Sequence, residues 1–253
     1  MLKPTPPKRL DEITREWDIA CFNRQRAIST GQDVSLLTVT APCILNEVAK
    51  EKPSTVLDIG CGTGYLTSRI AENVSRCTGI DCSHNSILIA QQNYCNDNIS
   101  FIETKLEDFF PRRQFDMCIS NMVFTSDPDY RASLKKSYSL LSDSGTLLVM
   151  ITHPCFWPKY WGFEKEPWFD YKREIFIEHD FSISLVKSLG KATYIHRPLD
   201  MYISAIAEAD SCIDGLEEPY PYTTVPCEYK YEYPRFLLIK CKKHRICTKR
   251  VML

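Results

Sequence analysis

The stretch "STVLDIGCGTGYLTSRIAEN", residues 54–73, holds the most specific pattern of the chain. An apolar run ends at Ile59, three glycines follow with one residue between each, and a helical pattern begins near Tyr65. A strand, a glycine turn and a helix in this order predict the first unit of a parallel sheet with crossover helices. The turn then lies at the carboxyl edge of the sheet, where open α/β folds bind their ligands.

The next hundred residues repeat this alternation, which is typical of a mostly parallel sheet covered by helices on both faces. The predicted strands are Thr55–Ile59, Arg76–Ile80, Ile99–Glu103, Phe115–Ser120 and Gly145–Ile151. The predicted helices between them are Tyr65–Asn73, Asn85–Tyr94 and Asp129–Leu141. We therefore predict an α/β fold with an open, doubly wound sheet.

Other segments flank this core. Two helices are predicted before it, over Lys8–Ala27 and Ser35–Lys50, with Pro42 a potential kink in the second. After the fifth strand, "THPCFWPKYWGFEKEPWFDY" (152–171) has no clear period, which indicates a cap or loop packed on the core. The remaining predicted elements are strand-like runs at Glu174–Leu185 and Thr193–His196, a helix at Pro198–Glu208, and a final pair at Ser211–Glu217 and Arg235–Cys241.

The length and the charge of the chain limit the number of domains and the kinds of partner it can bind. The 253 residues suit one domain, which we divide into an N-terminal helical lid (1–52), a cofactor-binding core (53–151), a cap insertion (152–197) and a last helix with strands (198–253). Lys plus Arg is 31 and Asp plus Glu is 32, so no global field favours nucleic acid or an anionic membrane. The start of the chain does not resemble an export signal, and no apolar run is long enough to span a membrane. We expect a cytoplasmic protein with a small partner.

The cysteines and histidines do not indicate a metal site. Twelve cysteines are scattered through the chain without a CxxC pair, and no two cysteines or histidines show the spacing of zinc ligands. We expect reduced, mostly buried thiols and no bound metal.

Two landmarks on successive strands indicate a nucleoside ligand. Gly60 and Gly62 have no side chains, so a ligand can lie against the backbone at the sheet edge. Asp81 ends the next strand, at the position where an acid accepts hydrogen bonds from both hydroxyls of a ribose. The glycine spacing is G-x-G-x-G, so the third glycine of the dinucleotide fingerprint G-x-G-x-x-G is missing and Tyr65 stands in its place. Pyrophosphate binding is therefore disfavoured.

The segments "VLDIGCGTG" and "TGIDCS" resemble the first two cofactor motifs of class I S-adenosylmethionine-dependent methyltransferases. The later segments "HPCFWP", "IHRPL" and "YPRFLLIKC" resemble a bacterial-type small-molecule subgroup of that superfamily. The resemblance implies a Rossmann-like sheet of seven strands, mostly parallel with an antiparallel last strand. It also implies methyl transfer from S-adenosylmethionine to an O or N atom of a small-molecule acceptor, with S-adenosylhomocysteine as product.

The same resemblance implies a cofactor site at successive strand ends. Asp58 supports the amino group of the methionine moiety, Asp81 holds the ribose, and the family acid that usually contacts the adenine is replaced by Lys105. The implied cofactor-binding residues are Asp58, Gly60, Cys61, Gly62, Asp81, Cys82, Leu106 and Asn121.

The acceptor site is expected between the sheet edge and residues 152–171, closed by the helices around residues 24–35. The fourth and fifth strands of such a sheet end beside the reacting methyl group, so the loop that leaves the fifth strand begins there. Its large aromatic side chains suit a water-excluding pocket for an uncharged or aromatic acceptor; they are Trp157, Tyr160, Trp161 and Trp168. His153 is a candidate base, since imidazole takes a proton near neutral pH.

Three other interpretations stay open. One is a non-catalytic S-adenosylmethionine-binding regulator, and another is a nicotinamide oxidoreductase. The third is an RNA methyltransferase, for which the basic run Lys240–Arg250 is the only feature in favour. The sequence specifies neither the oligomeric state nor the acceptor.

Overall fold

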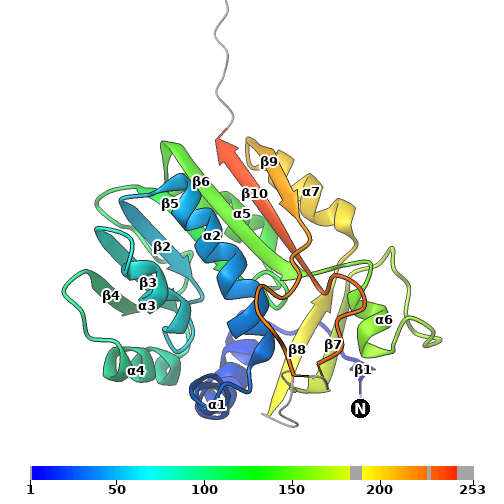
Figure 1. Ribbon diagram of the computed structural model, residues 1–253. Coiled ribbons are helices and arrows are strands. Elements are labelled where there is room, and N and C mark those ends of the chain that lie inside the picture. Colours follow the sequence, from blue (N-terminus) through cyan, green and yellow to red (C-terminus); the bar gives the residue numbers. More distant parts are fainter. Residues whose placement is uncertain (1, 183–189, 227–228, 244–253) are drawn as a thin grey trace, which may run out of the picture.

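The computed structural model describes residues 2–182, 190–226 and 229–243, and its centre is a seven-stranded sheet of order β4-β3-β2-β5-β6-β10-β9 (Figure 1). The strands are β2 (Thr55–Ile59), β3 (Arg76–Asp81), β4 (Ile99–Glu103), β5 (Phe115–Asn121), β6 (Leu141–Thr152), β9 (Ser211–Glu217) and β10 (Phe236–Lys243). β10 lies antiparallel between β6 and β9, and the other neighbours in the sheet pair in parallel. The predicted Rossmann-like sheet with an antiparallel last strand is confirmed.

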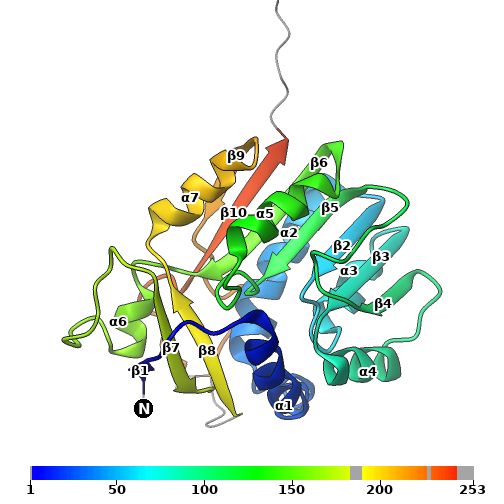
Figure 2. The same cartoon turned by 180° about the vertical axis from the view of Figure 1, so that it is seen from behind.

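Helices cover both faces of this sheet. α2 (Ala41–Glu51) and α3 (Tyr65–Ala71) lie on one face, and α5 (Tyr130–Ser139) and α7 (Leu199–Glu208) lie on the other (Figures 1 and 2). α4 (His84–Asn93) packs beside β3 and β4. No helix in the described part of the chain is long and apolar enough to cross a membrane.

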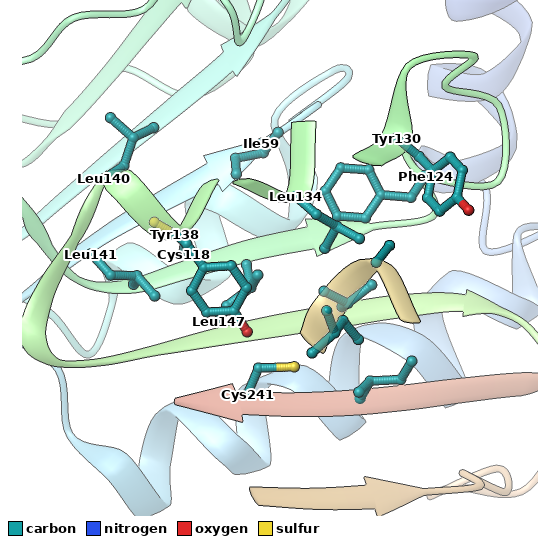
Figure 3. Packing of buried hydrophobic residues seen from close by; sticks show 14 of the residues in the cluster. Ile59, Cys118, Phe124, Tyr130, Leu134, Tyr138, Leu140, Leu141, Leu147 and Cys241 are labelled. Atoms are coloured by element: carbon teal, nitrogen blue, oxygen red, sulfur yellow. The ribbon is translucent and has the colours of Figure 1, made fainter. Parts of the chain in front are cut away.

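The larger hydrophobic cluster on the α5 and α7 side holds these layers together. Figure 3 shows Leu134 and Tyr138 of α5 packed with Cys118 of β5 and Leu147 of β6. Leu134, Cys118 and Leu147 are fully buried. Burial of a Leu side chain contributes about 1.5–3 kcal/mol, so this layer fixes β5 and β6 and thereby the strand ends that carry the site.

The N-terminal helices differ from the prediction in where they begin and end. α1 (Leu10–Ser29) ends two residues later than expected, and the helix predicted over residues 35–50 is divided in two. Residues Ser35–Thr40 form a π-helix, η1, and α2 begins at Ala41. Pro42 lies in the first turn of α2, where its missing N–H has no intrahelical partner to lose.

A second, three-stranded sheet stands beside the first. It has the order β1-β7-β8 and consists of β1 (Lys3–Pro4), β7 (Ile175–Asp180) and β8 (Lys191–His196), all antiparallel. α6 (Trp157–Trp161) is a short helix in the segment expected to lack a period. The two strand-like runs were predicted but this sheet was not, because no local pattern marks the pairing of residues about 170 apart. The end of the predicted run Glu174–Leu185 lies outside the described residues.

Helix α1 lies between the carboxyl edge of the large sheet and the small sheet (Figures 1 and 2). Towards the large sheet, Asp18 Oδ1 accepts hydrogen bonds from Ser83 Oγ (2.6 Å) and from the backbone N–H of Asn85 (3.1 Å). Towards the small sheet, Glu16 Oε1 accepts from Thr193 Oγ1 at 3.1 Å. The helix is therefore held over the region where the strands of the large sheet end.

Candidate cofactor and acceptor site

The glycine turn after β2 has three residues in the left-handed region, with φ of +66° at Gly60, +54° at Gly62 and +87° at Gly64. A Cβ at Gly60 would lie 2.3 Å from Val123 Cγ2, and one at Gly64 would lie 2.8 Å from Phe101 Cζ. A Cβ at Gly62 would meet nothing within 4 Å. The outer two glycines are thus required by packing within the protein, whereas Gly62 faces open space that a ligand can occupy.

Asp81 connects this turn to the next strand. Its Oδ2 accepts from the Gly62 N–H (2.9 Å), and its Oδ1 accepts from the Ser83 N–H (2.8 Å). Burial raises the pKa of Asp81 above its ordinary value, and these two backbone hydrogen bonds oppose the increase. Each carboxylate oxygen keeps a second lone pair, which is the arrangement needed to accept a hydrogen bond from a ligand hydroxyl.

Asp58 lies near the carboxyl end of β2, just before the turn. It is 1% exposed and accepts a hydrogen bond of 2.6 Å from Thr67 Oγ1. Burial raises the pKa of Asp58 to about 7, and the charge of Asp81 acts in the same direction. A small hollow of about 60 Å³ is lined by Asp58 together with Arg24, Cys61 and other residues of the turn. A cation placed in this hollow would favour the ionised form of Asp58.

A larger cavity of about 370 Å³ follows the carboxyl edge of the large sheet. The predicted cofactor-binding residues that line it are Gly60, Gly62, Asp81, Cys82, Leu106 and Asn121. The predicted acceptor-binding residues that line it are Trp157, Tyr160 and Trp161. The two predicted sets come from separate parts of the sequence and share one cavity. α1 and η1 cover it with Trp17, Arg24 and Ser35.

The structure places two predicted acceptor-side residues outside this cavity. Thr152 lines the cavity, but His153 is not among its described lining residues, because successive side chains of an extended chain point to opposite sides. The Nδ1 atom of His153 accepts from the Cys155 N–H (3.2 Å), and its Nε2 is 2.9 Å from Glu218 Oε1. Trp168 stacks on Phe163 in the hydrophobic cluster behind the cavity wall and is not among the described lining residues. We therefore assign no chemical role to His153 or Trp168.

His179 is a lining residue that the sequence did not indicate. It lies on β7, 6% exposed, with its ring edge-on to Trp161 at a centroid distance of 4.2 Å. Burial lowers the pKa of His179 to about 4, so the ring is neutral near pH 7. Only the pairing of β7 with β8, in which His179 lies opposite Ala192, brings it to the cavity. No sequence motif marks such a position.

Lys105 occupies the position where the resembled family has an acid, and it contacts α1. Its Nζ lies 2.9 Å from Asp11 Oδ1, and both Lys105 and Glu107 line the cavity. The charge reversal is thus accompanied by an ion pair between the loop after β4 and the covering helix. No group of His, Cys, Asp or Glu within the described residues is arranged to hold a metal ion.

Comparison with known proteins agrees with this geometry. Residues 56–145 match a family model described as a methyltransferase domain. This part of the chain is therefore a methyltransferase domain, in agreement with the resemblance of its motifs to those of class I S-adenosylmethionine-dependent methyltransferases. The matched residues of this methyltransferase domain run from β2 into β6 and therefore include the glycine turn, Asp81 and Asn121.

Two curated relatives share part of the domain. A malonyl-[acyl-carrier protein] O-methyltransferase of Priestia megaterium is 35% identical over 95 residues, which is 37% of this chain and 35% of the relative. One of the same name from Bacillus cytotoxicus is 30% identical over 133 residues, or 50% of this chain and 46% of the relative. The chain thus spans less than half the length of these relatives.

Solved structures support the fold over a longer range. A putative S-adenosylmethionine-dependent methyltransferase from Listeria monocytogenes superposes with a TM-score of 0.62 at 23% identity, covering 81% of this chain and 99% of that one. The 1,6-didemethyltoxoflavin-N1-methyltransferase of Burkholderia thailandensis superposes with a TM-score of 0.60 at 16% identity, covering 96% of this chain and 94% of that one. At these identities the likeness shows the shared fold.

Proposed function

We propose that this protein transfers a methyl group from S-adenosylmethionine to an O or N atom of a small-molecule acceptor. One observation carries the proposal: the glycine turn and Asp81 line the same cavity as the aromatic residues of the cap. A protein that only bound the cofactor would need the first half of this cavity and not the second.

The cofactor half suits S-adenosylmethionine. Gly62 leaves open space above the turn, and Asn121 has a buried Oδ1 that lacks a partner among the described residues. In our proposal Gly60 to Gly62 pass the methionine moiety, Asp58 supports its amino group and Asp81 accepts from the ribose hydroxyls. Cys82 and Leu106 flank the adenine. When bound, the cofactor supplies an electrophilic methyl group on a sulfonium sulfur.

The contribution of the chain to such a reaction is orientation and exclusion of water. Trp157, Trp161 and Tyr194 form an apolar wall that fixes a bound acceptor against the strand ends, and α1 covers the opening. Holding two reactants in line removes much of the entropic barrier to their reaction. A closed, dry site also prevents loss of the methyl group to water.

The lining favours an uncharged or aromatic small molecule over RNA. The lysines at the described end of the basic run are already paired: Lys240 contacts Glu47 (3.1 Å) and Glu51 (2.5 Å), and Lys242 contacts Glu51 and Asp214. The rest of the run to Arg250 lies outside the described residues. The compared proteins are named for different acceptors, a malonyl group on an acyl-carrier protein and the free molecule 1,6-didemethyltoxoflavin, so this choice rests on the lining of the cavity.

Calorimetric titration with S-adenosylhomocysteine, followed by transfer assays with methyl-labelled S-adenosylmethionine and a library of small acceptors, tests the proposal. We expect one bound cofactor per chain and label transferred to at least one acceptor. Tight cofactor binding without transfer to any acceptor would support a regulator. Competition by NAD would support an oxidoreductase, and binding of transfer RNA that weakens steeply with salt would support an RNA substrate.

A further inference from the structure

The small hollow beside the glycine turn carries charges of both signs. It has a volume of about 60 Å³ and shares Gly60, Gly62 and Asn121 with the larger cavity, so the two spaces meet beside the turn. Arg24 of α1 also lines both spaces, and it is the only cationic residue among the described lining residues of the hollow. Asp58 lines the same hollow. The hollow therefore suits a group that carries both a positive and a negative charge.

The guanidinium group of Arg24 is accessible and has hydrogen-bond donors to offer. The side chain is 26% exposed, and its Nη2 lies 3.5 Å from Asp33 Oδ2. This ion pair is longer than a hydrogen bond, and Asp33 Oδ2 accepts no hydrogen bond from any described residue. A guanidinium has five N–H donors in a planar fork that matches a carboxylate. The contact with Asp33 thus holds Arg24 in place and leaves donors for a second carboxylate.

The charges around the turn give this donor a specific task. The methionine end of the proposed cofactor carries an ammonium group and a carboxylate group. Asp58 and Asp81, on either strand beside the turn, favour the ammonium group and repel the carboxylate. Lys105 and Lys136 line the larger cavity but are not among the described lining residues of the hollow. Arg24 is therefore the group that can compensate a carboxylate at this position.

Arg24 also belongs to the helix that covers the cavity. α1 ends at Ser29, and the connection from it to η1 passes through Asp33, whose Oδ1 accepts from the Leu36 N–H at 3.1 Å. A ligand group that binds Arg24 therefore ties the last turns of α1, and the connection to η1, to the glycine turn of the large sheet.

We propose that Arg24 binds the carboxylate group at the methionine end of the cofactor, and that this contact holds α1 closed over the cavity. The inference rests on the function proposed above and adds a specificity-determining residue on the covering helix. The site then distinguishes the complete cofactor from nucleosides that lack the carboxylate. The acceptor half is closed from solvent only when the complete cofactor is bound.

Two ligands that differ in one group test the carboxylate contact. S-adenosylhomocysteine and its decarboxylated form share the nucleoside, the thioether and the amino group. We expect calorimetric titration of the wild type to show about 10- to 150-fold tighter binding of S-adenosylhomocysteine, the value of hydrogen bonds to a charged group. Arg24→Ala should lose most of this preference, because only its affinity for S-adenosylhomocysteine falls. Arg24→Lys, which restores the charge without the planar fork, should keep part of the preference.

Arg26→Ala is the matched control variant. Arg26 lies two residues further along α1, is exposed, and is not among the described lining residues of the cavity or the hollow. Its replacement removes the same charge from the same helix and should leave the preference unchanged. If Arg24 served only to hold Asp33, Arg24→Ala would weaken the binding of both ligands equally. The ratio of two affinities does not depend on the folded fraction, so partial unfolding cannot imitate the result.

Hydrogen exchange of the wild type, saturated with each ligand in turn, tests the link to the covering helix. S-adenosylhomocysteine should slow exchange in residues 24–35 more than its decarboxylated form does, and Arg24→Ala should remove this difference. Equal protection of the wild type by the two ligands would overturn closure by the carboxylate.

Equal affinity of the wild type for the two ligands, or a full preference in Arg24→Ala, would overturn the carboxylate contact itself. The proposed function survives both outcomes, since it fails only if S-adenosylhomocysteine does not bind or no acceptor is methylated. The same titrations therefore separate failure of this inference from failure of the proposed function.

Discussion

The two halves of the cavity are built in opposite ways. The cofactor half comes from residues that directly follow consecutive strands, so the glycine turn, Asp81, Leu106 and Asn121 lie within about 60 residues of sequence. The acceptor half combines α6, β7, β8 and α1, which meet only through long-range pairing and packing. Local motifs therefore identify the first half, whereas the second depends on tertiary structure.

The halves also differ in charge. Carboxylates mark the cofactor half, where Asp58 is 1% exposed and Asp81 accepts from the N–H group of Gly62. Aromatic rings and a neutral imidazole mark the acceptor half. A cationic cofactor suits the first environment and an uncharged acceptor suits the second, which gives each half a distinct response to mutation.

The largest effect is expected from Gly62→Val, which should weaken S-adenosylhomocysteine binding by more than about a hundredfold. The branched side chain fills the open space over the turn and strains a left-handed backbone. Gly31→Val is the matched control, because Gly31 also has positive φ (+75°) and open space but does not line the cavity. Calorimetry and thermal melting should show similar destabilisation in both variants and loss of binding only at Gly62. Near-normal binding by Gly62→Val would mean that the cofactor lies elsewhere.

Asp81→Ala should weaken cofactor binding by about 10- to 150-fold, the value of about 1.5–3 kcal/mol for hydrogen bonds to a charged group. The carboxylate also accepts from the N–H groups of Gly62 and Ser83, so we expect a lower melting temperature as well. Asp116→Ala separates the two effects. Asp116 accepts from the N–H groups of Ser54 and Thr55 at the opposite edge of the sheet, so its loss should reduce stability and leave binding unchanged.

The contrast between local motifs and long-range pairing also explains which parts of the structure could be predicted from the sequence. All five core strands were placed within a few residues, because alternating apolar runs and the turn at Gly60–Gly64 are local signals. β6 begins at Leu141 instead of Gly145, because its first residues, Ser142 to Gly145, are of the types common in turns and hide the start of the strand. The fold followed from these signals, and the same signals placed the residues of the proposed cofactor half along one edge of the sheet.

The acceptor half was predicted as a region but not residue by residue. The position of Trp157 and Trp161 at the cavity agrees with the expectation, since the cap must begin where β6 ends. Two features decide which side chains face the cavity: the alternation of side-chain direction along the chain after Thr152, and the pairing of β7 with β8. Neither feature has a recognisable sequence pattern. The sequence therefore indicated His153 and gave no signal for His179.

A smaller effect is expected from pH, through Asp58. The pKa of Asp58 is about 7 in the fold against an ordinary value of 3.8, so the folded state keeps a proton that the unfolded chain releases between about pH 4 and 7. Stability should therefore fall as the pH rises through this window, and Asp58→Asn should remove that part of the fall.

Cofactor binding should show the opposite trend. The ammonium group favours ionised Asp58, so the affinity for S-adenosylhomocysteine should increase by up to about tenfold from pH 6 to pH 8. The difference between wild type and Asp58→Asn isolates this contribution from Asp33 and Asp81, whose pKa values are also raised by burial. Parallel pH profiles in the two proteins would show that Asp58 does not contact the amino group.

The smallest effect concerns the cover that the two halves share. α1 contacts the large sheet through Asp18 and the small sheet through Glu16. A change in the mobility of α1 on cofactor binding should therefore also change the mobility of the acceptor half. We expect S-adenosylhomocysteine to slow hydrogen exchange in residues 24–35 and 152–171 more than in β9, the strand at the edge of the large sheet away from the turn (Figure 1). The physical reason is that a lid must open for exchange of cofactor and product, and a bound ligand favours the closed form. Mass spectrometry of peptides from both segments measures this. Protection of residues 60–65 alone would show that the two halves are independent and that α1 is a fixed wall.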